Sequence, residues 1–254
     1  MMKILVKGII LVKLSNCSLC KFTNHFNLII IVLYLNKLHQ KMLKLKTPLK
    51  KGSKLLINAW SFYDWANSVY SLVITTAIFP LYYASIFNNV NHITVFEFEV
   101  KNTAMISFIT AFAFIIIVLI IPILSGIADY IENKKIFMKF FVYMGSISCV
   151  LLYWFEIENI YTSLFFYFLA LIGFWSSLVF YNSFLPDIAY PHQQDKTSAL
   201  GYSMGYIGSI ILLLINLIMV TNPYWFGIEG SYDEASIEAM KYSFITVGLW
   251  WFLF

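Results

Sequence analysis

Long apolar runs dominate the pattern of hydrophobic and polar positions through most of the chain. They lie at about 66–87, 103–124, 137–155, 160–182 and 199–220, and a further run starts near 242. A helix needs about 20 apolar residues to cross about 30 Å of hydrocarbon, and each of the first five runs is close to that length. The pattern predicts an all-α, polytopic membrane protein.

The first span carries a polar stripe, and we expect its helix to begin near residue 58 and to end near 87. At about 100° per residue, the polar positions fall on one side of this helix. They are Asp64, Asn67, Ser68, Ser71 and Thr75. Lipid offers no hydrogen bonds, so such a stripe usually faces a protein interior or a watery cavity.

We interpret Asp64, Asn67, Ser71 and Thr75 as residues of a substrate pathway. In this interpretation Asp64 lies at the cytoplasmic mouth of the cavity and is linked to substrate or to protons. Two alternatives stay open. Asp64 could be a helix-start acid satisfied by Asn67, by Ser68 or by a lysine of the preceding segment, and the other polar residues could serve helix packing.

The last apolar run, Tyr242–Phe254, has 13 residues and is too short to cross a bilayer. Ser231-x-x-Glu234 precedes it and predicts a capping box that opens a short helix running into this span. We therefore expect a truncated sixth helix. The chain would then be a fragment or would depend on a partner that completes it.

The N-terminal segment differs from the rest of the chain. Residues 1–41 hold apolar patches too short to span a membrane, and we expect them to be a doubtful extension from an upstream start or a weak interfacial helix. Residues 42–57 form a basic leader suited to the cytoplasm. Cys17 and Cys20 form a lone CxxC without a second pair, so we predict no metal site.

Composition and charge fit a membrane protein. The 254 residues are 60% hydrophobic and 12% charged, with a mean hydropathy of +0.77, whereas a soluble domain carries about twice that charge fraction. The net charge of +4 comes from 17 lysines and no arginine. These lysines are spread over loops, so the charge does not indicate nucleic-acid binding.

The lysines alternate between loops, and this alternation predicts the orientation. Two loop lysines, Lys101 and Lys241, lie on one side. Nine lie on the other side: Lys44, Lys46, Lys50, Lys51, Lys54, Lys134, Lys135, Lys139 and Lys196. By the positive-inside rule, the N-terminus is cytoplasmic. Aromatic residues near span ends are expected to form membrane-interface belts: Trp60, Trp65, Tyr82, Tyr83, Trp154 and Trp225.

The loop between the second and third spans, residues 125–135, places an acid before a turn and two lysines. Asp129 can hold a neighbouring helix end, and Lys134 and Lys135 can meet carbonyl groups or acidic lipid. Asn133 could adopt a left-handed turn conformation. Asp187, which follows Pro186 at the end of the fourth span, is expected to act in the same conformational latch.

The fourth and fifth spans supply further candidates. Gly201, Gly205 and Gly208 share one helical face and predict close packing of the fifth helix against a neighbour. Trp175 and Asn182 on the fourth helix are secondary candidates for the substrate cavity. We predict no catalytic residue and no metal ligand.

Three landmarks resemble a known transporter family. The 125–135 loop is similar to the major facilitator superfamily signature, although Ser125, Tyr130 and Glu132 replace its two glycines and its arginine. YDWANS (63–68) and FYNSFLPDIA with ALGYSMGYIGS (180–209) resemble the vacuole effluxer-like branch of that superfamily. The resemblance covers about 55–254. It implies a six-helix N-terminal bundle over 58–254 whose C-terminal six-helix half is missing.

The resemblance implies secondary active export of a small solute, with amino acids as candidates and with protons as a coupling ion, by alternating access in a bacterial plasma membrane. The alternative is a truncated, non-transporting membrane subunit or an inactive remnant. An intramembrane enzyme is disfavoured, because no GxSxG motif and no His within a span is found. A nucleotide-binding loop is also lacking in the sequence, so we expect no cofactor.

Overall fold

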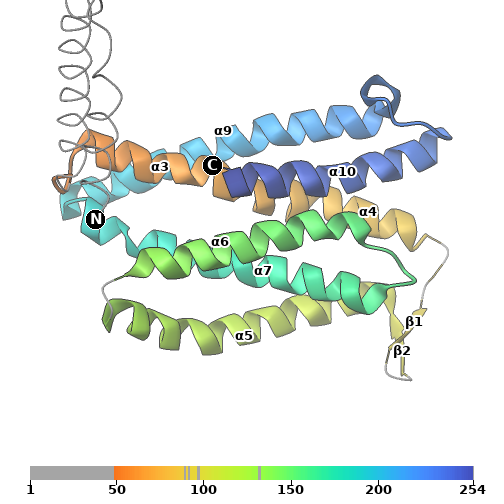
Figure 1. Ribbon diagram of the computed structural model, residues 1–254, viewed down its shortest axis with the longest axis horizontal. Coiled ribbons are helices and arrows are strands. Elements are labelled where there is room, and N and C mark those ends of the chain that lie inside the picture. The colour runs from red at the N-terminus through yellow and green to blue at the C-terminus, as the bar shows by residue number, and fades with distance from the viewer. Residues whose placement is uncertain (1–48, 89, 91, 96–97, 131–132, 254) are drawn as a thin grey trace, which may run out of the picture. The chain divides into compact units, whose positions relative to one another are not determined.

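The computed structural model describes residues 49–253 apart from 89, 91, 96–97 and 131–132. The expectations for residues 1–41, for the start of the basic leader and for the CxxC pair lie outside the described residues. Residues 50–254 form one unit, which is a bundle of long helices. Figure 1 shows these helices running side by side along the long axis of the bundle.

The first helix of the bundle is continuous but changes its hydrogen-bond pattern in the middle. It consists of α3 (Lys54–Val69), the π-helical segment η1 (Tyr70–Ile78) and α4 (Phe79–Ile86). In a π-helix each N–H bonds five residues back, so a turn holds more residues than an α-helical turn. Side chains after Tyr70 are therefore displaced around the axis relative to a regular α-helix.

The remaining long helices follow in order. They are α5 (Asn102–Tyr130), α6 (Lys134–Leu151), α7 (Ile160–Ser183), α9 (Pro191–Thr221) and α10 (Tyr232–Leu253). Short helical turns connect some of them: η2 (Leu152–Trp154), α8 (Leu185–Ile188) and η3 (Pro223–Phe226). The all-α membrane fold is confirmed, since five helices of the described residues are long and apolar enough to span a membrane.

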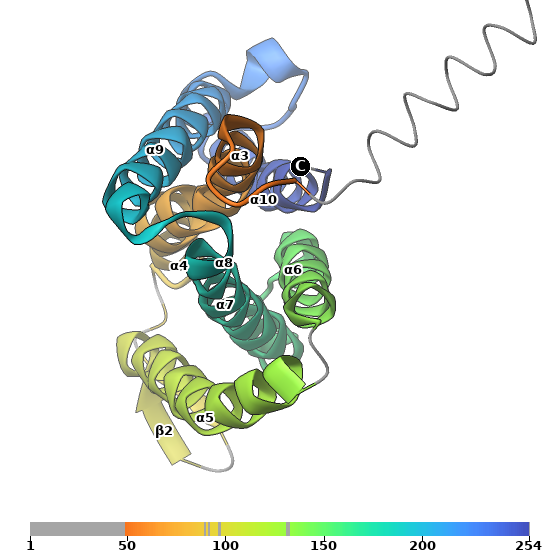
Figure 2. The same ribbon diagram turned by 90° about the vertical axis from the view of Figure 1, so that its left-hand side faces the viewer.

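The helices pack in neighbouring pairs. α3 lies along α9, α6 along α7, and α10 contacts both α6 and α9. Viewed end-on in Figure 2, α5 lies at the edge of the bundle, where it contacts mainly α7. Its most apolar window has a mean hydropathy of 3.0 and is only 22% buried, so α5 presents a largely apolar surface suited to lipid.

A β-hairpin that the sequence pattern did not predict follows the first helix. β1 (His92–Val95) pairs antiparallel with β2 (Phe98–Lys101), with His92 opposite Lys101. It lies at the end of the bundle opposite the start of α3 (Figure 1). Both strands alternate polar and apolar residues, His-Ile-Thr-Val and Phe-Glu-Val-Lys, so this alternation was the available signal.

The last helix is longer than its apolar run. α10 begins at Tyr232 and has 22 residues, of which the first half carries four charges. The capping box is confirmed: the Ser231 backbone N–H donates to Glu234 Oε2 at 3.0 Å, and the Glu234 N–H donates to Ser231 Oγ at 3.4 Å. Hydrogen bonds from the Ser231 hydroxyl and backbone N–H lower the pKa of the exposed Glu234 carboxyl.

Three of the aromatic residues expected in membrane-interface belts are instead buried. Trp60 is 9% exposed, Tyr82 2% and Tyr83 7%, whereas Trp154 and Trp225 are largely exposed. The polar atoms of the buried three find carbonyl partners inside the protein: Tyr82 donates to Phe155 O and Tyr83 to Asn102 O. Position near a span end shows that such a side chain can hydrogen-bond, but it does not show whether the partner is interfacial water or a protein carbonyl group.

Candidate functional site

A pocket of about 280 Å³ lies where the first helix meets α7 and α9. The first helix contributes polar side chains and one leucine, and the other two helices contribute mostly rings. The lining from the first helix is Asp64, Ser68, Ser71, Leu72 and Thr76. The lining from α7 and α9 is Phe174, Trp175, Leu178, Tyr202, Tyr206 and Ser209.

Asp64 lies at the inner wall of this pocket and is only 4% exposed. Ser68 Oγ donates a hydrogen bond of 2.8 Å to Asp64 Oδ1. The ion pairs recorded among the described residues involve Lys134 and Lys241, and neither pairs with Asp64. Within the part of the chain that the structure describes, the carboxyl group is therefore buried beside a hydroxyl group and forms no recorded ion pair.

The glycine face of α9 brings that helix close to Asp64. A Cβ atom added at Gly205 would fall 2.6 Å from Ser68 Oγ and 3.2 Å from Asp64 Cγ. An added Cβ at Gly201 would lie 3.1 Å from the Trp60 ring, and one at Gly208 would lie 3.0 Å from the Trp65 ring. The three glycines thus face α3, and Gly205 lies near the middle of α9. Asp64 is therefore far from both ends of α9.

The π-helical segment changes which threonine lines the pocket. The α-helical spacing placed Thr75 beside Ser71, but Thr76 is the threonine that lines the pocket. Thr76 Oγ1 donates to the Ser71 carbonyl oxygen, five residues back, at 2.9 Å. In a π-helix a residue lies above the one five positions earlier, so Thr76 lies above Ser71.

The structure separates the other predicted pathway residues. Trp175 lines the pocket and is 36% exposed. Asn67 is fully buried on another side of α3, where its Oδ1 accepts from Tyr63 at 3.3 Å and from Ser177 at 3.4 Å. Asn182 is exposed near the end of α7 and does not line the pocket.

Tyr202 and Tyr206 line the pocket from α9 and were not predicted from the sequence. Each follows a glycine of the packing face by one residue, and the two tyrosines are four residues apart. Residues at this spacing lie on the same side of a helix. This spacing next to the glycine face was the available signal.

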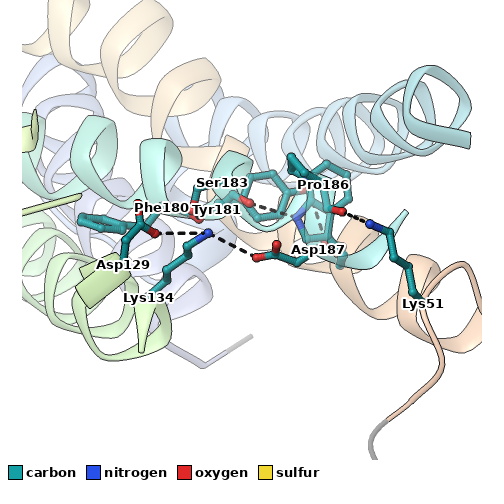
Figure 3. A network of polar contacts seen from close by, with 9 residues as sticks. Lys51, Asp129, Lys134, Phe180, Tyr181, Ser183, Pro186 and Asp187 are labelled. Atoms are coloured by element: carbon teal, nitrogen blue, oxygen red, sulfur yellow. Dashed lines mark hydrogen bonds and ion pairs between the residues drawn. The ribbon is translucent and has the colours of Figure 1, made fainter. Parts of the chain in front are cut away.

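At the end of the bundle where α3 begins, one lysine joins two acids. Lys134 Nζ lies 3.5 Å from Asp129 Oδ1 at the end of α5 and 3.3 Å from Asp187 Oδ2 in α8 (Figure 3). Lys135 is exposed and takes part in none of the ion pairs recorded for the described residues. Asn133 has φ −137°, so it does not adopt the left-handed conformation that an asparagine allows there.

The start of α3 is attached to the same region. Lys51 Nζ donates to the Pro186 carbonyl oxygen (Figure 3), and the Gly52 N–H donates to the Ile188 carbonyl oxygen at 2.7 Å. Gly52 has φ +77°, a backbone conformation that residues other than glycine rarely adopt. Asp187 and its neighbours therefore contact both the start of α6 and the segment that leads into the first helix.

A reciprocal contact between Trp60 and Tyr181 holds α3 against α7. The two rings stack with centroids 4.3 Å apart. Trp60 Nε1 donates to the Tyr181 carbonyl at 3.0 Å, and the Tyr181 hydroxyl donates to the Trp60 carbonyl at 3.2 Å. Trp60 precedes the YDWANS stretch and Tyr181 belongs to the FYN stretch, so these two sequence landmarks meet in the fold.

Chemically, the pocket can bind a small molecule, but it lacks the features of a metal centre. Among the described residues, no group of three or more His, Cys, Asp or Glu side chains is arranged to hold a metal ion. One carboxyl group, several hydroxyl groups and exposed rings make a site suited to reversible binding. Convergent polar groups in a partly apolar pocket are typical of ligand sites.

Comparison with known proteins agrees with these landmarks. Residues 52–254 match the family described as "Vacuole effluxer Atg22 like". The chain is 37% identical over 199 residues to the "Uncharacterized MFS-type transporter YxiO" of Bacillus subtilis (strain 168), which covers 78% of this chain and 44% of the relative. It is 27% identical over 175 residues to an "Uncharacterized protein" of Aquifex aeolicus (strain VF5), covering 68% of this chain and 41% of that protein. No solved structure matches the chain.

The chain spans less than half the length of these two relatives. The family match nevertheless extends over nearly all the described residues, including α3 with Asp64, the Lys134 ion pairs and the glycine face of α9. A bundle of apolar spans with these landmarks identifies the chain as a multi-pass membrane protein. The chain therefore belongs to the vacuole effluxer Atg22-like family.

Proposed function

We propose that this bundle is the N-terminal half of a secondary active transporter that exports a small solute. The single observation that carries the proposal is the buried Asp64 carboxyl group in a pocket whose described lining holds no lysine or histidine. Burying such a group is costly unless a partner or a proton neutralises it. A solute or a proton that arrives and leaves would meet this requirement.

Alternating access requires a second helical bundle, and we propose that such a bundle completes the pocket. Tyr202 and Tyr206 are 60% and 63% exposed on the α9 side of the pocket. Transporters of this class bind solute between two bundles near the middle of the membrane. We propose that the second bundle covers the face that carries Tyr202 and Tyr206. We further propose that the protein lies in a bacterial plasma membrane, with its N-terminus in the cytoplasm. Amino acids are the first candidate solutes, and protons the first candidate coupling ion.

In this proposal the Lys134 ion pairs form a conformational latch. They join α5, α6 and α8 at the end of the bundle that carries the clustered lysines. Asp129 is 65% exposed and Asp187 58% exposed, and exposed ion pairs contribute at most about 1 kcal/mol each. Pairs of this strength can form and break during a transport cycle without unfolding the bundle.

The latch predicts different effects for two neighbouring lysines. Lys134→Ala removes both ion pairs, and we expect the maximal transport rate to fall about fivefold while KM stays within about twofold. Lys135→Ala removes the same charge without breaking either pair, so its rate should stay close to that of the parent protein. Initial efflux rates over a range of solute concentrations measure both. A large change in KM for Lys134→Ala would place this lysine at the solute site and contradict the latch.

Reconstitution tests the proposed function. The purified chain is placed in liposomes loaded with labelled amino acids, alone and together with the part of the Bacillus subtilis relative that the chain does not match. We expect efflux when both parts are present. If efflux in both preparations equals that from loaded liposomes without protein, the chain is instead a non-transporting subunit or an inactive remnant.

A further inference from the structure

The pocket combines one acid with aromatic rings and hydroxyl groups. Asp64 is the single charged residue among the described residues that line it. Phe174 and Trp175 of α7 and Tyr202 and Tyr206 of α9 supply its rings. No lysine or histidine belongs to this described lining, so the described lining offers no cation to a ligand carboxylate. The charge of the pocket therefore favours a ligand group that is positive.

The environment of Asp64 leaves it available for such a group. Its Oδ1 accepts the one hydrogen bond recorded for this side chain, from Ser68. Asp64 also lines the pocket, so a bound ligand can reach it. A ligand ammonium group would supply both hydrogen-bond donors and a positive charge. Hydrogen bonds between charged groups are stronger than those between neutral groups.

The rings add a second attraction for a cation. A positive group near the face of an aromatic ring is attracted by the negative potential of that face, with tryptophan the strongest partner. Trp175 is held by edge contact with Phe174, at a centroid distance of 5.3 Å, and by Phe114 at 5.5 Å. Gly205, which lies between Tyr202 and Tyr206 in sequence, lets α9 approach Asp64, because it has no side chain to fill the space.

We infer that this half of the protein recognises its solute through a protonated amine that pairs with Asp64 and faces the rings of Trp175, Tyr202 and Tyr206. The inference rests on the proposed function, because it takes the pocket as the solute site. The pocket volume of about 280 Å³ suits a small molecule with one amine and a compact apolar body. Both an amino acid and a simple amine present this chemistry.

Three probes with related carbon frameworks test the inference. Phenethylamine carries only the amine, phenylalanine carries an amine and a carboxylate, and hydrocinnamate carries only the carboxylate. Their binding to the purified 254-residue chain in lipid nanodiscs is measured by isothermal titration calorimetry. We expect an amine-bearing probe to bind and hydrocinnamate not to bind. Tighter binding of phenylalanine identifies the amine as that of an amino acid, and tighter binding of phenethylamine identifies a simple amine.

Matched variants separate the site from general effects. Asp64→Asn should weaken amine binding by about tenfold or more, because the charge is lost at nearly constant shape. Asp195→Asn removes the same charge from an exposed position on α9 and should leave binding unchanged. Trp175→Leu should weaken binding several-fold, whereas Trp154→Leu, outside the pocket, should not.

Two results would overturn the inference. In the first, hydrocinnamate binds as tightly as phenethylamine. In the second, neither phenethylamine nor phenylalanine binds. The probe series on the parent chain decides the question even where Asp64→Asn does not fold. Binding is measured without transport, so the two proposals fail separately. Efflux from the reconstituted pair without amine binding would refute this inference alone, and amine binding without efflux would refute the proposed function.

Discussion

Asp64→Asn is expected to reduce solute efflux at least about tenfold while the chain still inserts into the membrane. Asparagine has nearly the same shape as aspartate and can still accept the hydrogen bond from Ser68, so the local packing should survive. It cannot carry a charge or release a proton. The loss should therefore appear in the initial efflux rate of the reconstituted pair and not in the amount of protein in the membrane.

The control for this prediction is a second acid in a different place. Asp195→Asn on the exposed surface of α9 makes the same chemical change outside the pocket, and efflux should match that of the parent protein. Ser68→Ala keeps the carboxyl group and removes its partner, so it should cause a smaller loss than Asp64→Asn. If Asp64→Asn exports solute at the parental rate at equal protein levels, Asp64 is a structural acid and the pathway role is refuted.

Gly173→Ala should strongly destabilise the bundle. α6 and α7 touch backbone to backbone at Gly145 and Gly173. A Cβ atom added at Gly173 would lie 2.6 Å from the Gly145 nitrogen and 2.8 Å from the Phe141 carbonyl oxygen. Backbone atoms cannot move away as a side-chain end can, so the two helices must separate. Overpacking of this kind costs about 1–3 kcal/mol, and we expect the upper part of that range.

Gly126→Ala is the matched control for Gly173→Ala. Gly126 also lies within a long helix, α5, but no atom lies within 4 Å of the position that its Cβ would occupy. This substitution should leave the midpoint of thermal unfolding nearly unchanged, whereas Gly173→Ala should lower it by several degrees, as measured by intrinsic fluorescence in detergent. Equal midpoints for the two variants would show that the α6–α7 crossing can relax and that its close contact is not required.

The sequence was informative wherever one helix or one loop determined the answer. Apolar run lengths predicted the membrane-spanning helices, and Ser231 with Glu234 predicted the start of α10. The polar stripe also led to Asp64 and Ser71, which line the pocket. These features depend on local periodicity and on side chains a few residues apart, which are directly readable from the chain.

The features that the sequence did not predict depend on contacts between distant segments or on a change of helix type. The π-helical segment replaced Thr75 with Thr76 in the pocket, and no motif in the sequence marks this change. Asn67 turned inward because Ser177 of α7 lies opposite it. Lys134 is the lysine that pairs with Asp129 and Asp187, and the packing of α5, α6 and α8, which the sequence does not show, brings it to them.

The central claim is that the Asp64 pocket faces an aqueous pathway inside the membrane and does not face lipid. Reaction of single cysteines with a water-soluble, membrane-impermeant maleimide tests this claim most directly, in a background with Cys17, Cys20 and Cys149 replaced by alanine. Ser71→Cys lies in the pocket, and Leu119→Cys lies on the surface of α5, where the native leucine is 62% exposed. We predict that Ser71→Cys reacts readily and Leu119→Cys very slowly, because the thiolate that reacts needs water. Equal, slow reaction at both positions would place the pocket against lipid and contradict the account.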